Sequence, residues 1–262
     1  MTTATETSAQ LLAEANLEHR RLQELPIEVR PANDAAAYEA QAKLVPLLLQ
    51  RIGGKVFGYK IACTNKLAQE QLHVSEPFFG RLLSATSFDS GVKLEADDYF
   101  MRVAEAEFAF RMGDDLPAAK GPWSPEQVRD AVAGVLPGVE IVDSRFDDWT
   151  NVGTPSLIAD NACHAAWIRG QIVRDWRGID LASTAVRLEV NGTVQGEGSG
   201  AAVLGHPLNA LHWLANRLNE FGLSLQAGQY VTTGVTTDIY LVEAGDRVAA
   251  DFGPVGRVEF SF

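Results

Sequence analysis

Two glutamates lie two residues apart in an apolar run, at a spacing that could support metal chemistry. Residues 101–110 read MRVAEAEFAF, with Glu105 and Glu107 among valine, alanine and phenylalanine. Such alternation predicts a β-strand, and residues i and i+2 of a strand face the same side of the sheet. The two carboxylates should therefore project together, and they repel each other unless a cation lies between them.

Glu140 adds a third carboxylate within GVEIVDSRF (residues 138–146), which also predicts a strand. A carboxylate on a buried strand is costly unless it is paired or bound to a metal. Three carboxylates from neighbouring strands would form an all-oxygen site for Mg²⁺ or Mn²⁺ rather than for structural zinc. The simpler alternative is that Glu105 and Glu107 lie on the exposed face of an edge strand, because one short motif is weak evidence.

Lys60 is the second candidate for chemistry. It lies within KVFGYKIAC (residues 55–63), which predicts a buried strand, and lysine is seldom buried without a purpose. Its amine could bind a substrate carboxylate or transfer a proton. Alternatively, the side chain reaches solvent at a strand end, or it pairs with one of the acids.

Other reactive side chains form no familiar grouping. His73 and Glu76 have a spacing at which they could act together as a general base, but their helix-to-loop segment is more typical of the protein surface. Cys63 and Cys163 lack metal-type spacing and resemble small core residues, so we expect no disulfide and a reducing compartment. The glycine-rich stretch 192–205 lacks the lysine of a phosphate loop, which argues against a nucleotide site.

The bulk composition excludes several classes of partner. The 262-residue chain carries a formal net charge of −12, which disfavours nucleic acid and anionic membranes as partners. Its first residues lack the basic and apolar regions typical of a secretory signal, and no run of about 18 apolar residues occurs, so we expect neither a signal nor a membrane span. We therefore expect a cytoplasmic protein that binds a small molecule.

The elements that must position these residues follow from hydrophobic periodicity and from turn residues. The expected helices span residues 6–22, 31–52, 65–72, 124–136 and 206–222. Asn33 or Asp34 should cap the second helix, and Pro46 should kink or divide it. Residues 86–98 and 147–158 should be loops.

Further strands are expected in the second half of the chain, where Asn191-Gly192 predicts a hairpin. Helices early in the chain and strands later predict an α+β fold, with helices beside a largely antiparallel, rolled sheet. Residues 1–55 would form an N-terminal helical region, and residues 56–262 a catalytic core, within one continuous domain.

Eight stretches in order across residues 34–262 resemble one known family. They are GYKIACTNKLAQEQL, EPFFGRLL, VAEAEFAF, GVEIVDSRF, ADNACHAAWIRG, GAAVLGHPLNALHWLANRL, AGQYVTTG and AGDRVAADFGPVGRVEF. Together they are similar to the 2-keto-4-pentenoate hydratase and 4-oxalocrotonate decarboxylase family, within the fumarylacetoacetate hydrolase superfamily. The resemblance implies that superfamily's rolled β-sheet core with peripheral helices, and a homo-oligomer.

The resemblance also implies roles for individual residues. The family's Glu-x-Glu metal pair falls on Glu105 and Glu107, and its third acid falls on Glu140. The family's active-site lysine, in Gly-Tyr-Lys, falls on Lys60. A Thr-Gly near the substrate falls on Thr233, which is therefore expected to bind substrate together with Lys60.

Several positions depart from the family pattern. Phe78 stands where many of these hydratases carry an acid, and a bulkier mouth at this position suggests a substrate with an apolar tail. Cys163 and His164 stand where the family often has small hydroxyl residues. After Thr233-Gly234 the family often has serine, whereas this chain has Val235 and Thr236. The metal ligands are unaffected.

The lid motif His-x-x-Glu of the superfamily's hydrolases is missing from residues 64–71, which argues against hydrolysis of a carbon–carbon bond. The resemblance therefore implies a lyase, a Mg²⁺- or Mn²⁺-dependent hydratase that adds water to a 2-hydroxy-2,4-dienoate in aromatic catabolism. The alternatives are a decarboxylase of a 4-oxalocrotonate-type 2-keto acid and a non-catalytic partner in a complex. A decarboxylase would need a basic residue for the distal carboxylate, for which Arg81 is the nearby candidate.

Overall fold

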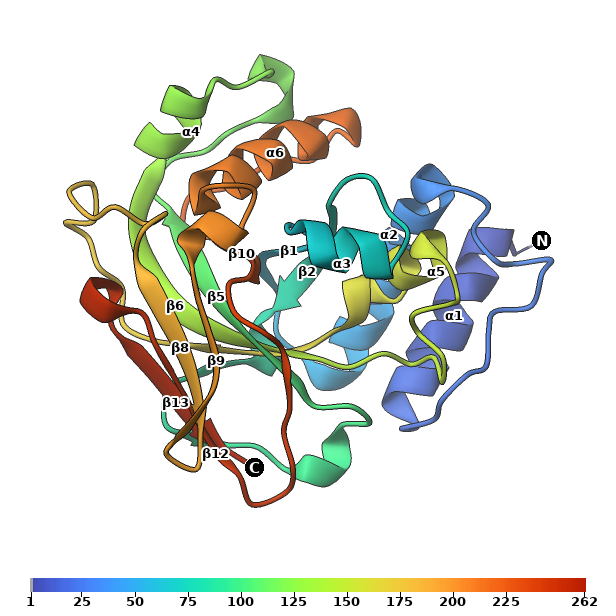
Figure 1. Ribbon diagram of the computed structural model, residues 1–262. Coiled ribbons are helices and arrows are strands. Elements are labelled where there is room, and N and C mark those ends of the chain that lie inside the picture. Colours follow the sequence, from blue (N-terminus) through green and yellow to red (C-terminus); the bar gives the residue numbers. More distant parts are fainter. Residues whose placement is uncertain (1) are drawn as a thin grey trace.

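Two β-sheets with helices around them make up the computed structural model, which describes residues 2–262 (Figure 1). The larger sheet contains β1 (Val56–Ala62), β2 (Phe78–Leu83), β3 (Ser87–Asp89), β5 (Val103–Met112), β6 (Val132–Val142), β7 (His164–Arg169), β10 (Tyr230–Val235) and β11 (Tyr240–Leu241). The smaller sheet contains β4 (Val92–Lys93), β8 (Ala185–Val190), β9 (Thr193–Ser199), β12 (Arg247–Asp251) and β13 (Arg257–Ser261).

Most neighbouring strands in both sheets are antiparallel. The larger sheet has the order β2-β1-β10-β5-β6-β7-β3, with β11 paired to β5, and the smaller has the order β4-β13-β12-β8-β9. In the larger sheet β1 and β10 are parallel, and residues 58–60 of β1 pair with residues 230–232 of β10. The long pair of β5 and β6 therefore lies inside the sheet, with neighbours on both sides.

The helices gather around these sheets (Figure 1). They are α1 (Ala4–Leu17), α2 (Asp34–Ile52), α3 (Lys66–Gln71), α4 (Pro125–Asp130), α5 (Thr154–Ala159) and α6 (Pro207–Glu220). Figure 1 shows α1, α2 and α5 together on the side away from β8, β9, β12 and β13. The expected α+β class is confirmed, with helices beside mostly antiparallel sheets.

Local sequence signals explain several helix ends. Asn33 caps α2 through its side chain, as expected, and accepts a hydrogen bond from the Ala36 backbone. Ser124 forms a capping box at α4, where Pro125 is the first helical residue. The β8–β9 hairpin turns at Asn191-Gly192, as predicted.

Some expected boundaries were wrong. The helix predicted over residues 124–136 ends at Asp130, because the apolar residues from Val132 onward pair with β5 instead. Pro46 does not divide α2, which runs continuously to Ile52 and packs against α1 and α5. The predicted loop 86–98 contains the short strands β3 and β4, and the predicted loop 147–158 contains most of α5.

The N-terminal helices contact the rest of the fold as well as each other. Helix α2 packs against α1, α5 and β2. The predicted division at residue 55 stays a prediction. Among residues 2–262, no helix combines the length and the apolar character needed to cross a membrane.

Candidate metal centre and active site

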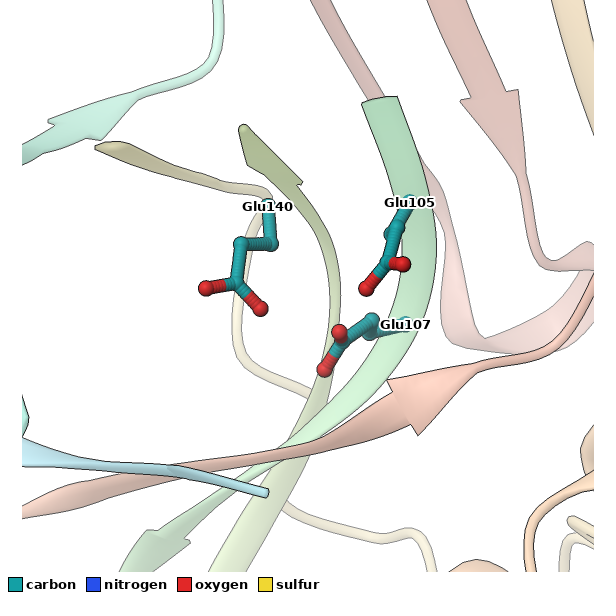
Figure 2. A group of neighbouring side chains, drawn as sticks. All are labelled: Glu105, Glu107 and Glu140. Carbon is teal, nitrogen blue, oxygen red and sulfur yellow. The ribbon is translucent and has the colours of Figure 1, made fainter. Parts of the chain in front are cut away.

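Three carboxylates meet on one face of the β5–β6 pair. Glu105 lies directly opposite Glu140 in the strand register, and Glu107 lies opposite Gly138. One oxygen from each glutamate lies within 4.8 Å of the others. Figure 2 shows Glu105 and Glu107 approaching Glu140 from the neighbouring strand. The structure thus brings together the three acids that the sequence singled out, and it excludes the exposed edge strand, since β5 has neighbours on both sides.

The donor atoms fit a hard divalent cation. Glu107 and Glu140 are fully buried, whereas Glu105 is partly exposed. Within residues 2–262, Oε1 of Glu107 and Oε2 of Glu140 are buried without a hydrogen-bond partner. Buried polar atoms are normally paired, and an all-carboxylate set suits Mg²⁺, Mn²⁺ or Ca²⁺.

The carboxylates perturb one another strongly. Burial and the nearby Glu140 charge raise the pKa of Glu105 to about 7, although Lys60 opposes the shift. Burial, with the charges of Glu140 and Glu105, raises the pKa of Glu107 well above its usual range. Burial also opposes ionisation of Glu140, but Lys60 and a hydrogen bond from His164 together lower its pKa. The cluster is therefore short of positive charge.

Lys60 reaches this cluster from β1. Its Nζ lies 3.2 Å from Oε1 of Glu140 and donates to the Ala162 backbone oxygen at 2.9 Å. Burial disfavours its charged form, but Glu140, Glu105 and Glu107 outweigh burial and raise its pKa. Lys60 is therefore an ammonium ion, and the structure supports the predicted ion pair over a side chain that reaches solvent.

A short left-handed turn, Asn161–Cys163, completes the arrangement between α5 and β7. Its three residues have φ values of 50°, 53° and 58°, a conformation that non-glycine residues rarely adopt in succession. The Asn161 side chain holds the turn against β2, accepting from the Arg81 N–H at 2.7 Å and donating to the Arg81 oxygen at 2.9 Å. A Cβ on Gly80 would collide with the Asn161 backbone oxygen.

His164 directly follows this turn, and the sequence interpretation did not place it in the site. Its Nδ1 lies 2.8 Å from Oε1 of Glu140, and the residue is buried. The only signal in the sequence was its departure from the small hydroxyl residues of the family. Its orientation depends on the pairing of β6 with β7, which no local pattern reveals.

Beside the carboxylates lies a cavity of about 260 Å³. Lys60, Glu105 and Gly234 line it, together with polar Thr64, Asn65, Gln71, Thr237 and Asp238. Most of the remaining wall is apolar and includes Leu67, Leu72, Phe78, Val142, Trp149, Leu157, Val235 and Ile239. A cavity with one charged end and an apolar wall suits a small carboxylate with an apolar body.

The Thr233-Gly234 pair divides its contacts between the sheet and the site. The Thr233 hydroxyl donates to the Phe108 backbone oxygen at 2.8 Å, and this threonine is not among the residues that line the cavity. Gly234 lines the cavity, and its N–H donates to Oε2 of Glu107 at 2.8 Å. Substrate binding by Thr233 stays a prediction.

Other candidates from the sequence lie outside the cavity or are unreactive. Arg81, the candidate partner for a distal carboxylate in a decarboxylase, turns its guanidinium to the Gln41 side chain and does not line the cavity. Glu76 pairs with Arg217 at 3.6 Å, away from the site. Cys63 and Cys163 line the cavity, but burial raises the pKa of each thiol to about 12.

The chain is similar to several known proteins. The family model described as fumarylacetoacetate (FAA) hydrolase C-terminal matches residues 66–262. The chain is 36% identical over 260 residues to a 2-hydroxyhexa-2,4-dienoate hydratase of Comamonas testosteroni, covering 98% of this chain and 97% of that one. It is 34% identical over 232 residues to a 2-keto-4-pentenoate hydratase of Burkholderia vietnamiensis, covering 88% and 87%.

A solved structure is similar over almost its whole length. This is 4-oxalocrotonate decarboxylase from Pseudomonas putida G7, complexed with magnesium and adipate. The TM-score is 0.91 at 29% identity, and the match covers 98% of this chain and 97% of that one.

Proposed function

Since the chain belongs to the fumarylacetoacetate hydrolase family, we propose that it is a divalent-metal-dependent lyase that hydrates a 2-hydroxy-2,4-dienoate. The product is a 4-hydroxy-2-ketoacid. The observation that carries this proposal is the convergence of Glu105, Glu107 and Glu140 at the charged end of a largely apolar cavity. Relatives that match nearly the whole chain are named as hydratases of such dienoates.

The three glutamates would hold Mg²⁺ or Mn²⁺. The unpaired oxygens of Glu107 and Glu140 support this assignment, as does the shortage of positive charge in the cluster. The bound ion supplies a Lewis acid that makes the oxygen on C2 of the substrate an electron sink. The similar decarboxylase is complexed with magnesium.

The chain's own residues would bind and orient the substrate. Lys60, held as an ammonium ion by Glu140 and the Ala162 oxygen, binds the substrate carboxylate. The apolar wall around Phe78 and Leu72 holds the diene and excludes bulk water. The dienol first becomes a 2-keto-3-enoate as its proton moves to C5. The oxygen of water then bonds to C4 and a proton is added at C3.

Hydration is favoured over decarboxylation by the charge of the cavity wall. A 4-oxalocrotonate-type acid carries a second, distal carboxylate, which needs a cationic partner when it is buried. Among the described residues that line the cavity, Lys60 is the only lysine or arginine, and it lies at the metal end. The distal part of the substrate should therefore be uncharged. Decarboxylation is the second candidate because the similar solved structure is a decarboxylase.

The test is a spectroscopic assay on metal-stripped protein with 2-hydroxypenta-2,4-dienoate, with and without Mg²⁺ or Mn²⁺. Metal-dependent loss of dienol absorbance, with formation of 4-hydroxy-2-oxopentanoate, is the expected result, and Glu107→Gln should abolish it. In parallel, release of CO₂ from 4-oxalocrotonate without hydration of the dienoate would favour the decarboxylase. Metal binding without either reaction would point to a non-catalytic partner. We further propose that the protein is a homo-oligomer that acts in aromatic catabolism in the cytoplasm.

A further inference from the structure

His164 touches the carboxylate cluster without belonging to it. Its side chain is buried, and Nδ1 lies 2.8 Å from Oε1 of Glu140. An ionised carboxylate can only accept a hydrogen bond, so Nδ1 carries the proton and donates it. This contact joins β7 to Glu140, which lies near the C-terminal end of β6.

Two donors therefore hold the same oxygen of Glu140. Lys60 lies 3.2 Å from Oε1, and His164 approaches that oxygen from the neighbouring strand. The second oxygen, Oε2, has no partner within residues 2–262. The carboxylate is thus held at Oε1, and Oε2 remains free to bind a cation.

One structural element places both donors. The left-handed turn Asn161–Cys163 directs the Ala162 oxygen to Lys60 and leads directly into His164. The Asp160 carboxylate fastens the start of the turn by accepting from Nε of Arg145 at 2.6 Å. Strained backbone of this kind persists only where the surrounding structure holds it, and it is concentrated at functional sites.

We propose that His164 is a positioning residue that fixes Oε1 of Glu140 and thereby presents Oε2 to the divalent cation. The inference rests on the proposed metal site. Without the imidazole, Lys60 alone holds the carboxylate, which can then rotate so that both oxygens face the ammonium group. Partners that orient a metal ligand in this way typically contribute about 10- to 100-fold to metal affinity or activity.

Two substitutions separate the hydrogen bond from the volume of the ring. His164→Asn keeps an N–H donor close to the position of Nδ1, and His164→Leu keeps apolar volume without a donor. His212→Leu is the matched control, because it removes a partly buried histidine of α6 whose Nε2 lies 2.9 Å from the Trp123 backbone oxygen. Mn²⁺ affinity is measured by calorimetry and by the paramagnetic resonance of bound Mn²⁺, beside thermal unfolding of each metal-free variant.

We expect His164→Leu to weaken Mn²⁺ binding about 10- to 100-fold, with His164→Asn closer to wild type and His212→Leu unchanged. Substrate turnover at saturating Mn²⁺ should recover in His164→Leu more than in Glu107→Gln. Folded His164→Leu that binds Mn²⁺ as tightly as wild type would overturn the inference, as would equal losses in the Leu and Asn variants. Wild-type protein that binds no Mn²⁺ would overturn the proposed function itself, and the inference with it.

Discussion

Glu105 and Glu140 are direct cross-strand partners in the antiparallel β5–β6 pair. Like charges in this arrangement destabilise a sheet, and these two lie where water cannot screen them fully. The protein therefore places a local electrostatic penalty at the position where its proposed cation binds. This relationship leads to the first two predictions.

Replacing Glu105 by glutamine should stabilise the metal-free protein. The change removes one charge from the cluster while keeping its shape, and we expect a gain of up to about 1 kcal/mol, or about 2–4 °C in Tm. Thermal unfolding in EDTA at pH 8 measures it, and added Mn²⁺ should stabilise the variant less than wild type. Glu197→Gln, on the exposed strand β9, is the control and should change little. A lower Tm for metal-free Glu105→Gln would contradict the prediction.

The stability of the metal-free protein should fall as pH rises. The folded-state pKa of Glu105 is about 7, against 4.5 for an ordinary glutamate, and that of Glu107 is also raised. A raised carboxyl pKa stabilises the fold fully below pH 4.5, and this contribution is lost as pH rises through about 7. The increase in Tm caused by Mn²⁺ should therefore be larger at pH 8 than at pH 5.5. An equal increase at both values would refute the argument, and Glu105→Gln should reduce the difference.

Replacing Lys60 by methionine should separate metal binding from turnover. The substitution removes a positive charge beside the cluster, so Mn²⁺ should bind at least as tightly as in wild type at pH 8. Turnover should fall about 100-fold or more, because the group proposed to bind the substrate carboxylate is gone. Calorimetry with Mn²⁺ and the dienol assay measure the two effects. A parallel loss of metal affinity and activity would show that Lys60 acts mainly on the fold.

Asp238 should be the base or acid that transfers a proton in the cavity. Of the ionisable residues that line it, Lys60 stays protonated, the thiols of Cys63 and Cys163 have pKa values near 12, and Glu105 belongs to the metal cluster. We expect Asp238→Asn to lower kcat by about 100-fold and to leave Mn²⁺ affinity unchanged. Full activity of the variant would assign proton transfer to bound water or to the substrate.

Adding a methyl group at Gly80 should weaken a metal site that Gly80 does not contact. The new Cβ would collide with the Asn161 backbone oxygen and displace the turn that holds Lys60 and places His164. Gly80→Ala should therefore lose Mn²⁺ affinity as well as stability. Gly178→Ala is the matched control, because no heavy atom lies within 4 Å of its added Cβ. Gly80→Ala with unchanged Mn²⁺ affinity would show that the turn tolerates displacement.

Local sequence pattern predicted the strands and the residues that share a face, but not their partners. Alternation in residues 101–110 is enough to place Glu105 and Glu107 on one side of β5. Their alignment with Glu140 depends on the register of β5 against β6, which is set by pairing across the sheet. The same holds for His164, whose contact requires β7 beside β6 and a bulge between Ile141 and Val142.

The misassigned elements have the same physical cause. Residues 132–136 follow a good helix start and contain apolar residues that suit either structure, yet in the fold they pair with β5 and belong to β6. The guanidinium of Arg81 turns to Gln41 on α2, a contact that no spacing along the chain predicts. The positive charge of Arg81 suggested a partner for the substrate, whereas its contact with Gln41 gives it a structural role between β2 and α2.

The parallel pairing of β1 with β10 makes the order of synthesis matter. Lys60 emerges from the ribosome early, but β10 lies between β1 and β5 in the finished sheet and is made near the end. Strands β1 and β5 cannot reach their final positions in the sheet until β10 has been synthesised. Such non-local pairing slows folding and leaves strand edges exposed meanwhile. A chain cut short before residue 230 would carry every proposed metal ligand and still lack the strand that joins them to Lys60.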